Sequence, residues 1–137
     1  MSEENKALAR RFYDESFGKG NLKALDEICA PDFLYRTPPP GISPDREGFD
    51  NVVALYRAAF PDLQIEFIVQ VAEGDTVANH TVARGIHKGE LQGLAATGKE
   101  VAVNGMSFLR IAGGRVVEFR GVADQLGMMQ QLGASPS

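Results

Sequence analysis

The sequence predicts an α+β fold in which N-terminal helices pack against a strongly curved antiparallel sheet. Two observations support this fold class. Apolar residues recur every three or four positions before Pro61 and every second position after it, so helices precede strands. This order differs from the alternating βαβ pattern that a parallel sheet requires. The 137 residues are expected to form a single domain, 1–137, that is long enough to bury its own core.

Two helices are expected before Pro31. An apolar stripe with a period near four includes Phe12 and is interrupted at Gly18. Asn21 is placed to cap a short second helix, which cannot continue through Pro31 because proline lacks a backbone N–H. The only cysteine, Cys29, falls on this predicted helix, and we expect it to be a buried structural thiol.

A third helix is expected to begin at Ser43-Pro44 and to end at Pro61. Serine is a good helix cap, and proline is favoured at the first helical position. The apolar stripe of this helix consists of Phe49, Val52, Val53, Tyr56 and Phe60. Before it come a brief aromatic strand, 33–37, and a stiff proline loop, 38–41, which we expect to form the rim of a site.

Four long antiparallel strands are expected after the helices, and Gly113-Gly114 suits a tight hairpin between the last two. They cover about residues 63–71, 77–87, 100–111 and 115–122. The drier face of the first strand is predicted to carry Leu63, Ile65, Phe67, Val69 and Val71. Helices that cover one side of such a sheet leave a conical cavity, bounded by the first and third helices and the concave face.

Composition argues against several partners and sites. Eighteen acidic and fourteen basic residues give a net charge of −4, and the basic residues are scattered, so nucleic acid is not an expected partner. No apolar run could cross a membrane and the first residues are polar and acidic, so a cytoplasmic protein is expected. His80 and His87 lie seven residues apart on one strand and face opposite sides, so no metal site is expected.

Asp124 is the most informative candidate residue, because it lies where the last strand ends and a helix begins. In a regular strand, positions 116 to 124 with even numbers would share one face, so Arg120 and Asp124 would both look into the cavity. A carboxylate in an apolar cavity has a raised pKa and exchanges protons near neutrality. Asp124 is equally well placed as the N-cap of the last helix, and the local sequence supports both interpretations.

Several polar residues among apolar neighbours are further candidates. Arg36 and Arg120 suit contacts with a carbonyl or an anion, since a guanidinium tolerates partial burial when it is paired. The expected catalytic set is Asp124, Arg120 and His80. The residues expected to contact a small apolar substrate are Phe12, Tyr13, Tyr35, Arg36, Phe49, Tyr56, Phe60, Asn104, Met106 and Phe108.

Short stretches spread over nearly the whole chain have the order and spacing of a known family. They are Phe12-Tyr13, Ala30-Pro31-Asp32-Phe33, Pro38-Pro39-Pro40-Gly41, Arg46-Glu47-Gly48-Phe49, Ala59-Phe60-Pro61-Asp62-Leu63, Ala83-Arg84-Gly85-Ile86-His87-Lys88-Gly89, Ala96-Thr97-Gly98-Lys99-Glu100-Val101, Gly114-Arg115-Val116-Val117-Glu118 and Asp124-Gln125-Leu126-Gly127. Together they resemble the SnoaL-like polyketide cyclases, or ester cyclases, of the nuclear transport factor 2-like and steroid delta-isomerase-like superfamily. The resemblance implies a cone-shaped, cystatin-like α+β barrel, a homodimer through the sheet face, and no metal or organic cofactor.

The resemblance also assigns Asp124 the role of acid and base in an intramolecular aldol closure. The chain departs from the family at several positions that tune the pocket. Arg36 stands where the family often has histidine, Phe119-Arg120 where it often has His-Trp, and His80-Thr81 where it often has Arg-Trp.

Three functions follow from these residues. The first is a cofactor-independent cyclase or isomerase acting on a polyketide-like substrate, in which Asp124 abstracts a proton beside a carbonyl and Arg120, Arg36 or His80 steadies the enolate. The second is a binding module that holds an apolar small molecule without converting it. The third is hydrolysis of an epoxide or ester by carboxylate-activated water, for which Asn79 and Asn104 are the available amides.

Overall fold

The computed structural model describes residues 2–134. The helices and turns are α1 (Ser2–Tyr13), η1 (Asp14–Gly18), η2 (Leu22–Ala24), α2 (Leu25–Ile28), α3 (Arg46–Ala59) and α4 (Gln125–Gln131). The strands are β1 (Cys29–Tyr35), β2 (Gln64–Glu73), β3 (Thr76–Ile86), β4 (Glu100–Ala112) and β5 (Arg115–Ala123). Each of the four long strands expected from the sequence is present, with ends close to those predicted.

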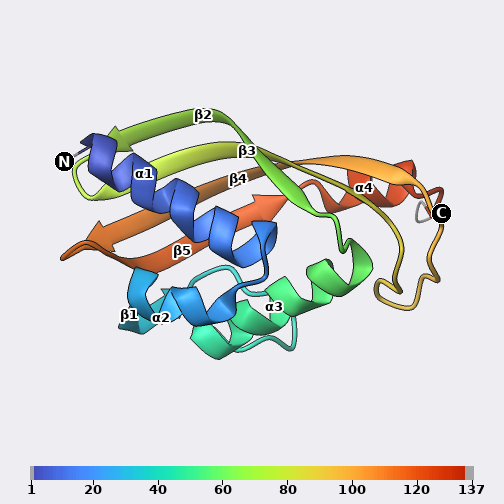
Figure 1. Ribbon diagram of the computed structural model, residues 1–137, viewed down its shortest axis with the longest axis horizontal. Coiled ribbons are helices and arrows are strands. Elements are labelled where there is room, and N and C mark those ends of the chain that lie inside the picture. Colours follow the sequence, from blue (N-terminus) through green and yellow to red (C-terminus); the bar gives the residue numbers. More distant parts are fainter. Residues whose placement is uncertain (1, 135–137) are drawn as a thin grey trace.

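The five strands form one curved sheet in the order β1-β5-β4-β3-β2, and α1, α2 and α3 lie on one side of it (Figure 1). Neighbours among β2 to β5 are antiparallel. The α+β class is therefore confirmed. One pair differs from the expected antiparallel sheet, because β1 runs parallel to β5.

The segment between α1 and β1 is less regular than predicted. The first helix widens into η1, a π-helical turn in which the Ser16 hydroxyl donates to the Phe12 carbonyl at 2.6 Å. Asn21 makes no side-chain cap, and its amide donates instead to the Glu15 carboxylate at 3.0 Å. Cys29 begins β1 rather than lying on a helix, and burial raises the pKa of its thiol to about 12. It is thus a buried structural thiol, as expected.

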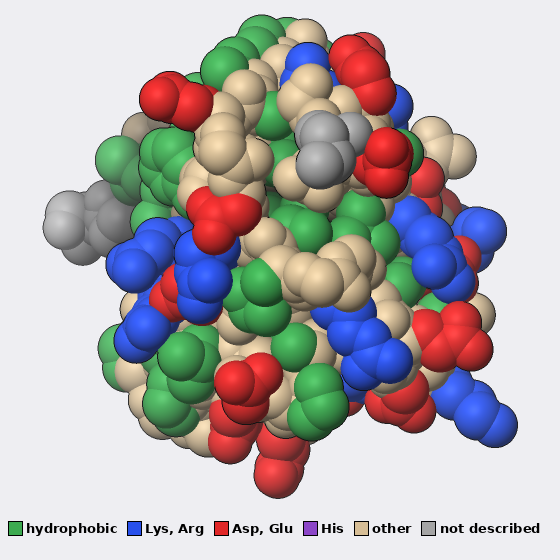
Figure 2. Space-filling model, turned by 90° about the vertical axis from the view of Figure 1, so that its left-hand side faces the viewer, with side chains coloured by type: hydrophobic (Ala, Val, Ile, Leu, Met, Phe, Trp, Pro, Cys, Tyr) green, Lys and Arg blue, Asp and Glu red, His purple; other side chains and the backbone are tan. Residues whose placement is uncertain are grey.

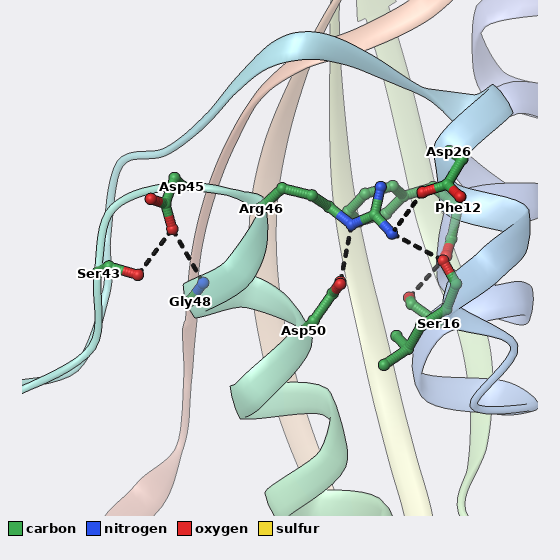
Figure 3. A network of polar contacts seen from close by, with 9 residues as sticks. Phe12, Ser16, Asp26, Ser43, Asp45, Arg46, Gly48 and Asp50 are labelled. Carbon is green, nitrogen blue, oxygen red and sulfur yellow. Dashed lines mark hydrogen bonds and ion pairs between the residues drawn. The ribbon is translucent and has the colours of Figure 1, made fainter.

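The third helix begins two residues later than predicted, because Asp45 rather than Ser43 is its N-cap (Figure 3). The Asp45 carboxylate accepts from the Gly48 backbone N–H at 3.0 Å and from the Ser43 hydroxyl at 2.7 Å. A side chain at Gly48 is excluded, since a Cβ there would come within 1.8 Å of the Ser43 carbonyl oxygen. Ser43 therefore supports the cap, and Pro44 precedes the helix.

A β-bulge in β5 changes which side chains face the helices. Ile111 pairs with Val116, but the preceding Arg110 pairs with Glu118, so Val117 is an extra residue. An extra residue reverses the alternation of side chains beyond it. Inward-facing positions after the bulge are therefore 119, 121 and 123, and the even-numbered positions face outward.

A second bulge has the same effect in β2. Phe67 pairs with Thr81, and Val69 pairs with the adjacent His80, so Ile68 is the extra residue. The expected dry face holds for Ile65 and Phe67, which pack against the core. It is wrong for Val69 and Val71, which are half exposed on the outer face.

The main core lies between the helices and the inner sheet face and is centred on aromatic rings. Phe12 and Phe49 are fully buried with ring centroids 5.0 Å apart. The Phe119 ring of β5 lies 5.6 Å from Phe12 and 5.3 Å from Phe49. A second cluster, which includes Phe60 and Met128, fills the end of the sheet beside α4.

The surface of the end that carries the N-terminus shows acidic and basic side chains interspersed with apolar groups (Figure 2). Between residues 2 and 134, every helix is too short or too polar to cross a bilayer.

Candidate functional site

A pocket of about 300 Å³ opens between the helices and the inner face of the sheet. Tyr13, Val52 and Tyr56 border it from the helical side, and the bulged strand β5 contributes Phe119 and Gly121. The inward residues of β2, β3 and β4 complete the walls with Ile65, Thr81, Ala83, Val101 and Val103. The expected cavity is therefore present where the first and third helices meet the concave face.

The polar groups of the lining are neutral. They are the hydroxyls of Tyr13, Tyr35, Tyr56, Thr37 and Thr81 and the amide of Gln125. Within residues 2–134, the side chains that border this pocket include no carboxylate, imidazole, ammonium or guanidinium. Such a lining suits an apolar ligand with a few carbonyl or hydroxyl groups.

The Tyr13 hydroxyl is held at the deep end of the pocket. It donates to the Ser107 hydroxyl oxygen at 2.7 Å, which also accepts from the Asn79 amide at 3.2 Å. Gln70 donates to the Asn79 oxygen at 2.9 Å and to the Lys6 backbone carbonyl at 3.2 Å. This chain of contacts ties β2, β3 and β4 to α1 and fixes the floor of the pocket.

Burial keeps two of the phenols protonated. Desolvation raises the pKa of Tyr13 well above its ordinary value, despite the opposing hydrogen bond to Ser107. Burial also raises the pKa of Tyr35, with a smaller contribution from Tyr56. At neutral pH both side chains are hydrogen-bonding hydroxyls rather than phenolates.

Lining residues of α3 and α4 meet at an exposed contact, which marks the mouth of the pocket. There the Gln125 Nε2 atom is 2.9 Å from the Tyr56 hydroxyl oxygen. Thr37 lies on the β1 side, where its hydroxyl donates to the Gly121 carbonyl at 2.9 Å and accepts from the Gly121 N–H at 2.8 Å. The loop predicted to form a rim contributes Pro39 to the lining.

Asp124 stands at this mouth, but its carboxylate is exposed. It caps α4 by accepting from the Gly127 N–H at 2.8 Å, and its own N–H donates to the Asn104 carbonyl at 2.9 Å. Ala123 and Gln125, its two neighbours in the chain, both border the pocket. Asp124 is therefore the N-cap in this conformation and lies beside the pocket rather than inside it.

The predicted contact residues separate into three groups. Those that border the pocket are Tyr13, Tyr35, Tyr56 and Phe60, together with Met106, which also has more than half of its surface exposed on the outer face of β4. Phe12 and Phe49 belong to the core, because they lie where helices and sheet are in direct contact. Arg36, Asn104 and Phe108 lie outside the lining, and so do His80 and Arg120, which were expected to be catalytic.

The predicted residues outside the lining lie on or beside the outer face of the sheet. Met106, Phe108 and Arg110 alternate with inward residues along β4, and Phe108 pairs with Arg120. The expected inward direction of Arg120 is wrong, since the bulge at Val117 turns it outward. His80 and Asn104 contact each other at 2.8 Å on that same outer face. Arg36 forms an ion pair there with Glu118 at 2.5 Å.

Several lining residues were not named from the sequence. Thr81, Val101 and Val103 alternate with outward residues of β3 and β4, so strand periodicity alone could have identified them. Gln125 had only its position next to Asp124 as a signal. Among the residues that the structure describes, no group of three histidine, cysteine, aspartate or glutamate side chains is arranged to hold a metal ion.

Known proteins of the same shape are numerous. IdmH of Streptomyces antibioticus, a candidate polyketide cyclase, is 34% identical, with a TM-score of 0.84 over 94% of this chain and 98% of its own. A candidate polyketide cyclase of Acidithiobacillus ferrooxidans is 28% identical, with a TM-score of 0.85 over 99% of each chain. AclR of Streptomyces galilaeus, a candidate hydroxylase, is 27% identical, with a TM-score of 0.86 over 99% of this chain and 100% of its own.

No curated protein sequence matches the chain. The family model described as SnoaL-like polyketide cyclase matches residues 7–132, which is nearly the whole chain. The match agrees with the solved structures of the same fold described above. The chain therefore belongs to the SnoaL-like polyketide cyclase family.

Proposed function

We propose that the protein binds a small, apolar, polyketide-like substrate and promotes its ring closure or isomerisation with Asp124 as the acid and base. The observation that carries this proposal is an apolar pocket whose mouth is bordered by both chain neighbours of a single carboxylate. The family match and the cyclase descriptions of two similar proteins support it. A neutral, apolar lining also favours an uncharged substrate over a phosphorylated one.

The proposed reaction needs no group beyond the substrate and one carboxylate. The Asp124 carboxylate removes a proton from a carbon that lies between two carbonyl groups. The resulting enolate carbon attacks another carbonyl of the same molecule, forming a carbon–carbon bond and an alkoxide. The proton on Asp124 returns to that alkoxide, so the carboxylate is regenerated. A positioned acid–base of this kind contributes about 10²- to 10⁴-fold.

The cap contact of Asp124 does not oppose this role strongly. Losing an N-cap hydrogen bond costs about 1 kcal/mol, so a rotamer released from the Gly127 N–H would be disfavoured about fivefold. That factor is small beside the expected gain from acid–base catalysis. A carboxylate that leaves the cap to meet a substrate remains an effective base.

A non-catalytic binding module is the second candidate. The specific observation in its favour is that Asp124 is already engaged as a cap, and the described lining itself carries no carboxylate or imidazole. Hydrolysis by activated water has less support. Asn104 lies outside the lining, and the Asn79 amide is occupied by Ser107 and Gln70.

Asp124→Asn separates the two candidates, because asparagine also caps helices but cannot accept a proton as a base. The measurement is exchange of the C2 proton of ethyl benzoylacetate, an aryl β-ketoester, followed by NMR in deuterated buffer. As an acid–base, Asp124 should accelerate exchange, and Asp124→Asn should abolish the acceleration while unfolding at nearly the wild-type temperature.

Asp124→Ala serves as the capping control. It should lower the free energy of unfolding by about 1 kcal/mol, whichever function is correct. Saturable binding of the β-ketoester with no acceleration above buffer would reject the enzymatic role and leave the binding module.

A further inference from the structure

Tyr56 and Gln125 form a polar pair across the pocket mouth. Tyr56 lies on α3, Gln125 is the first residue of α4, and the two residues border the same pocket. Their side chains meet at 2.9 Å between Nε2 of the amide and the phenol oxygen. The pair therefore joins α3 to α4 where both helices border the pocket.

The direction of this hydrogen bond leaves the phenol hydrogen free. An amide NH₂ only donates, so the Tyr56 oxygen is the acceptor in the pair. Among the hydrogen bonds of residues 2–134, the structure gives the Tyr56 hydroxyl no acceptor of its own. A donor whose oxygen is held by a neighbour and whose hydrogen is unused is preorganised to bind a carbonyl oxygen.

No cationic donor competes for this role. Arg36, Arg120 and His80 lie outside the pocket lining, and each has a contact on the outer face of the sheet. The Tyr13 hydroxyl is committed to Ser107 at the floor of the pocket. The Tyr56 hydroxyl stands instead at the mouth, opposite the residue that directly follows Asp124 in the chain.

We propose that Tyr56 is the hydrogen-bond donor to the substrate carbonyl beside Asp124, and that Gln125 is the residue that positions it. This inference rests on the proposed function for its catalytic consequence, because the donor would stabilise the enolate that Asp124 generates. Binding a carbonyl through Tyr56 does not depend on turnover. One preorganised donor of this kind contributes about 10²- to 10³-fold to the rate.

Two variants test the pair. Tyr56→Phe removes the donor and keeps the ring. Gln125→Glu keeps a side chain of the same length but makes it an acceptor, so the Tyr56 hydrogen turns toward the carboxylate and leaves the pocket. Gln130→Glu adds the same charge at an exposed position of α4 and is the matched control. Thermal unfolding and circular dichroism report whether each variant is folded.

The first readout is independent of catalysis. Ethyl benzoylacetate labelled with ¹³C at its ketone is bound to protein carrying Asp124→Asn, and the ketone stretch is measured by infrared difference spectroscopy. A hydrogen bond lowers the stretching frequency. The ketone band should have a low frequency in the Asp124→Asn protein, and Gln130→Glu should leave it there. Adding Tyr56→Phe or Gln125→Glu to Asp124→Asn should raise the frequency. An unchanged band in both variants, or no binding at millimolar concentration, overturns the proposal.

The second readout is the exchange rate of the unlabelled β-ketoester with Asp124 intact. Tyr56→Phe and Gln125→Glu should each lower it about 10²-fold, whereas Gln130→Glu should not change it. Exchange that needs Asp124 but is unaffected by Tyr56→Phe would refute the donor role and keep the proposed function. A ketone band that depends on Tyr56, together with no accelerated exchange in the wild type, would keep the donor role and refute the proposed function.

Discussion

Glu118 is a carboxylate shared by arginines on the outer face of the sheet. Its side chain is only 11% exposed, and it pairs with Arg110 and, at 2.5 Å, with Arg36. Arg120 lies further away, at 3.9 Å. The hydrogen bonds from Arg110 and Arg36 lower the pKa of Glu118 from 4.5 to about 2. Glu118 therefore links β4, β5 and the residue that follows β1 by charge, beside the backbone ladder.

Glu118→Gln should destabilise the protein in a pH-dependent way. Because the folded-state pKa lies below the ordinary value, the ionised carboxylate stabilises the fold above about pH 4.5, and this stabilisation is lost as the pH falls toward 2. The melting temperatures of variant and wild type should therefore differ at pH 7 and converge below pH 4.5. Glu90→Gln, at an exposed position, is the control. A difference that stays constant down to pH 2.5 would contradict the shared-carboxylate account.

Arg46 contacts η2 and α2, two helical segments that are too short to be stable on their own. Its Nε donates to Asp50 on the same helix at 2.8 Å, and its Nη2 donates to the Leu22 carbonyl at 2.7 Å and pairs with Asp26 at 3.2 Å (Figure 3). The α2 helix has only four residues and cannot be stable alone. Arg46 thus attaches η2 and α2 to the first turn of α3.

Arg46→Met should lower the free energy of unfolding by about 1 to 3 kcal/mol, because it leaves the Leu22 carbonyl and two carboxylates without their charged donor. Arg46→Lys should recover only part of this, since one ammonium cannot reproduce the planar guanidinium contacts. Urea unfolding checks both, with the exposed Arg10→Met as the control. A loss no larger than that of Arg10→Met would show that the contacts are replaced by water at no cost.

Sequence periodicity predicted the helices and strands well, but it predicted less well which side chains of the strands point toward the pocket. Helical spacing places Tyr56 of α3 and the C-cap residue Phe60 beside the pocket, as expected, because α3 is an uninterrupted α-helix from Arg46 to Ala59. Strand alternation holds in β3 and β4 but breaks at Ile68 and Val117. Neither bulge has a glycine or proline to mark it, so Arg120 was expected inside and lies outside.

The rest of the site depends on tertiary geometry that local patterns do not contain. Phe12 and Phe49 have the same helical spacing as pocket residues, yet helix–sheet contact buries them completely. Both interpretations of Asp124 were open in the sequence, and the structure presents the capping conformation. The Tyr56–Gln125 pair joins positions 69 residues apart in the chain, which no motif indicates.

At the scale of the whole molecule, the outer face of the sheet is unusually apolar. Phe108 is 54% exposed and Val122 is 69% exposed, and Met106 and Val71 are also more than half exposed. An apolar sheet face that helices leave uncovered calls for a partner. A second copy of the chain is the expected partner, since the family resemblance implies a homodimer through this face.

Phe108→Glu should therefore convert a dimer into a monomer, because two copies would bring buried carboxylates together in an apolar interface. Sedimentation velocity at tens of micromolar should show a dimer for the wild type and for Leu55→Glu, a control at an exposed position on α3. Observation of only monomer for the wild type at that concentration would count against the dimer. Retention of the dimer by Phe108→Glu would place the interface elsewhere.

The bulge at Val117 sets which side chains of β5 face the pocket, and this bears on how related chains diverge. If Val117 were instead paired as a regular residue of the ladder, the register beyond it would slip by one, so Glu118, Arg120 and Val122 would turn toward the pocket while Phe119 and Gly121 turned away. A neutral cavity would then acquire a carboxylate and a guanidinium without one amino-acid exchange. Straightening a bulge in these strands is thus a route by which descendants of one ancestor acquire a different pocket chemistry from the same residues.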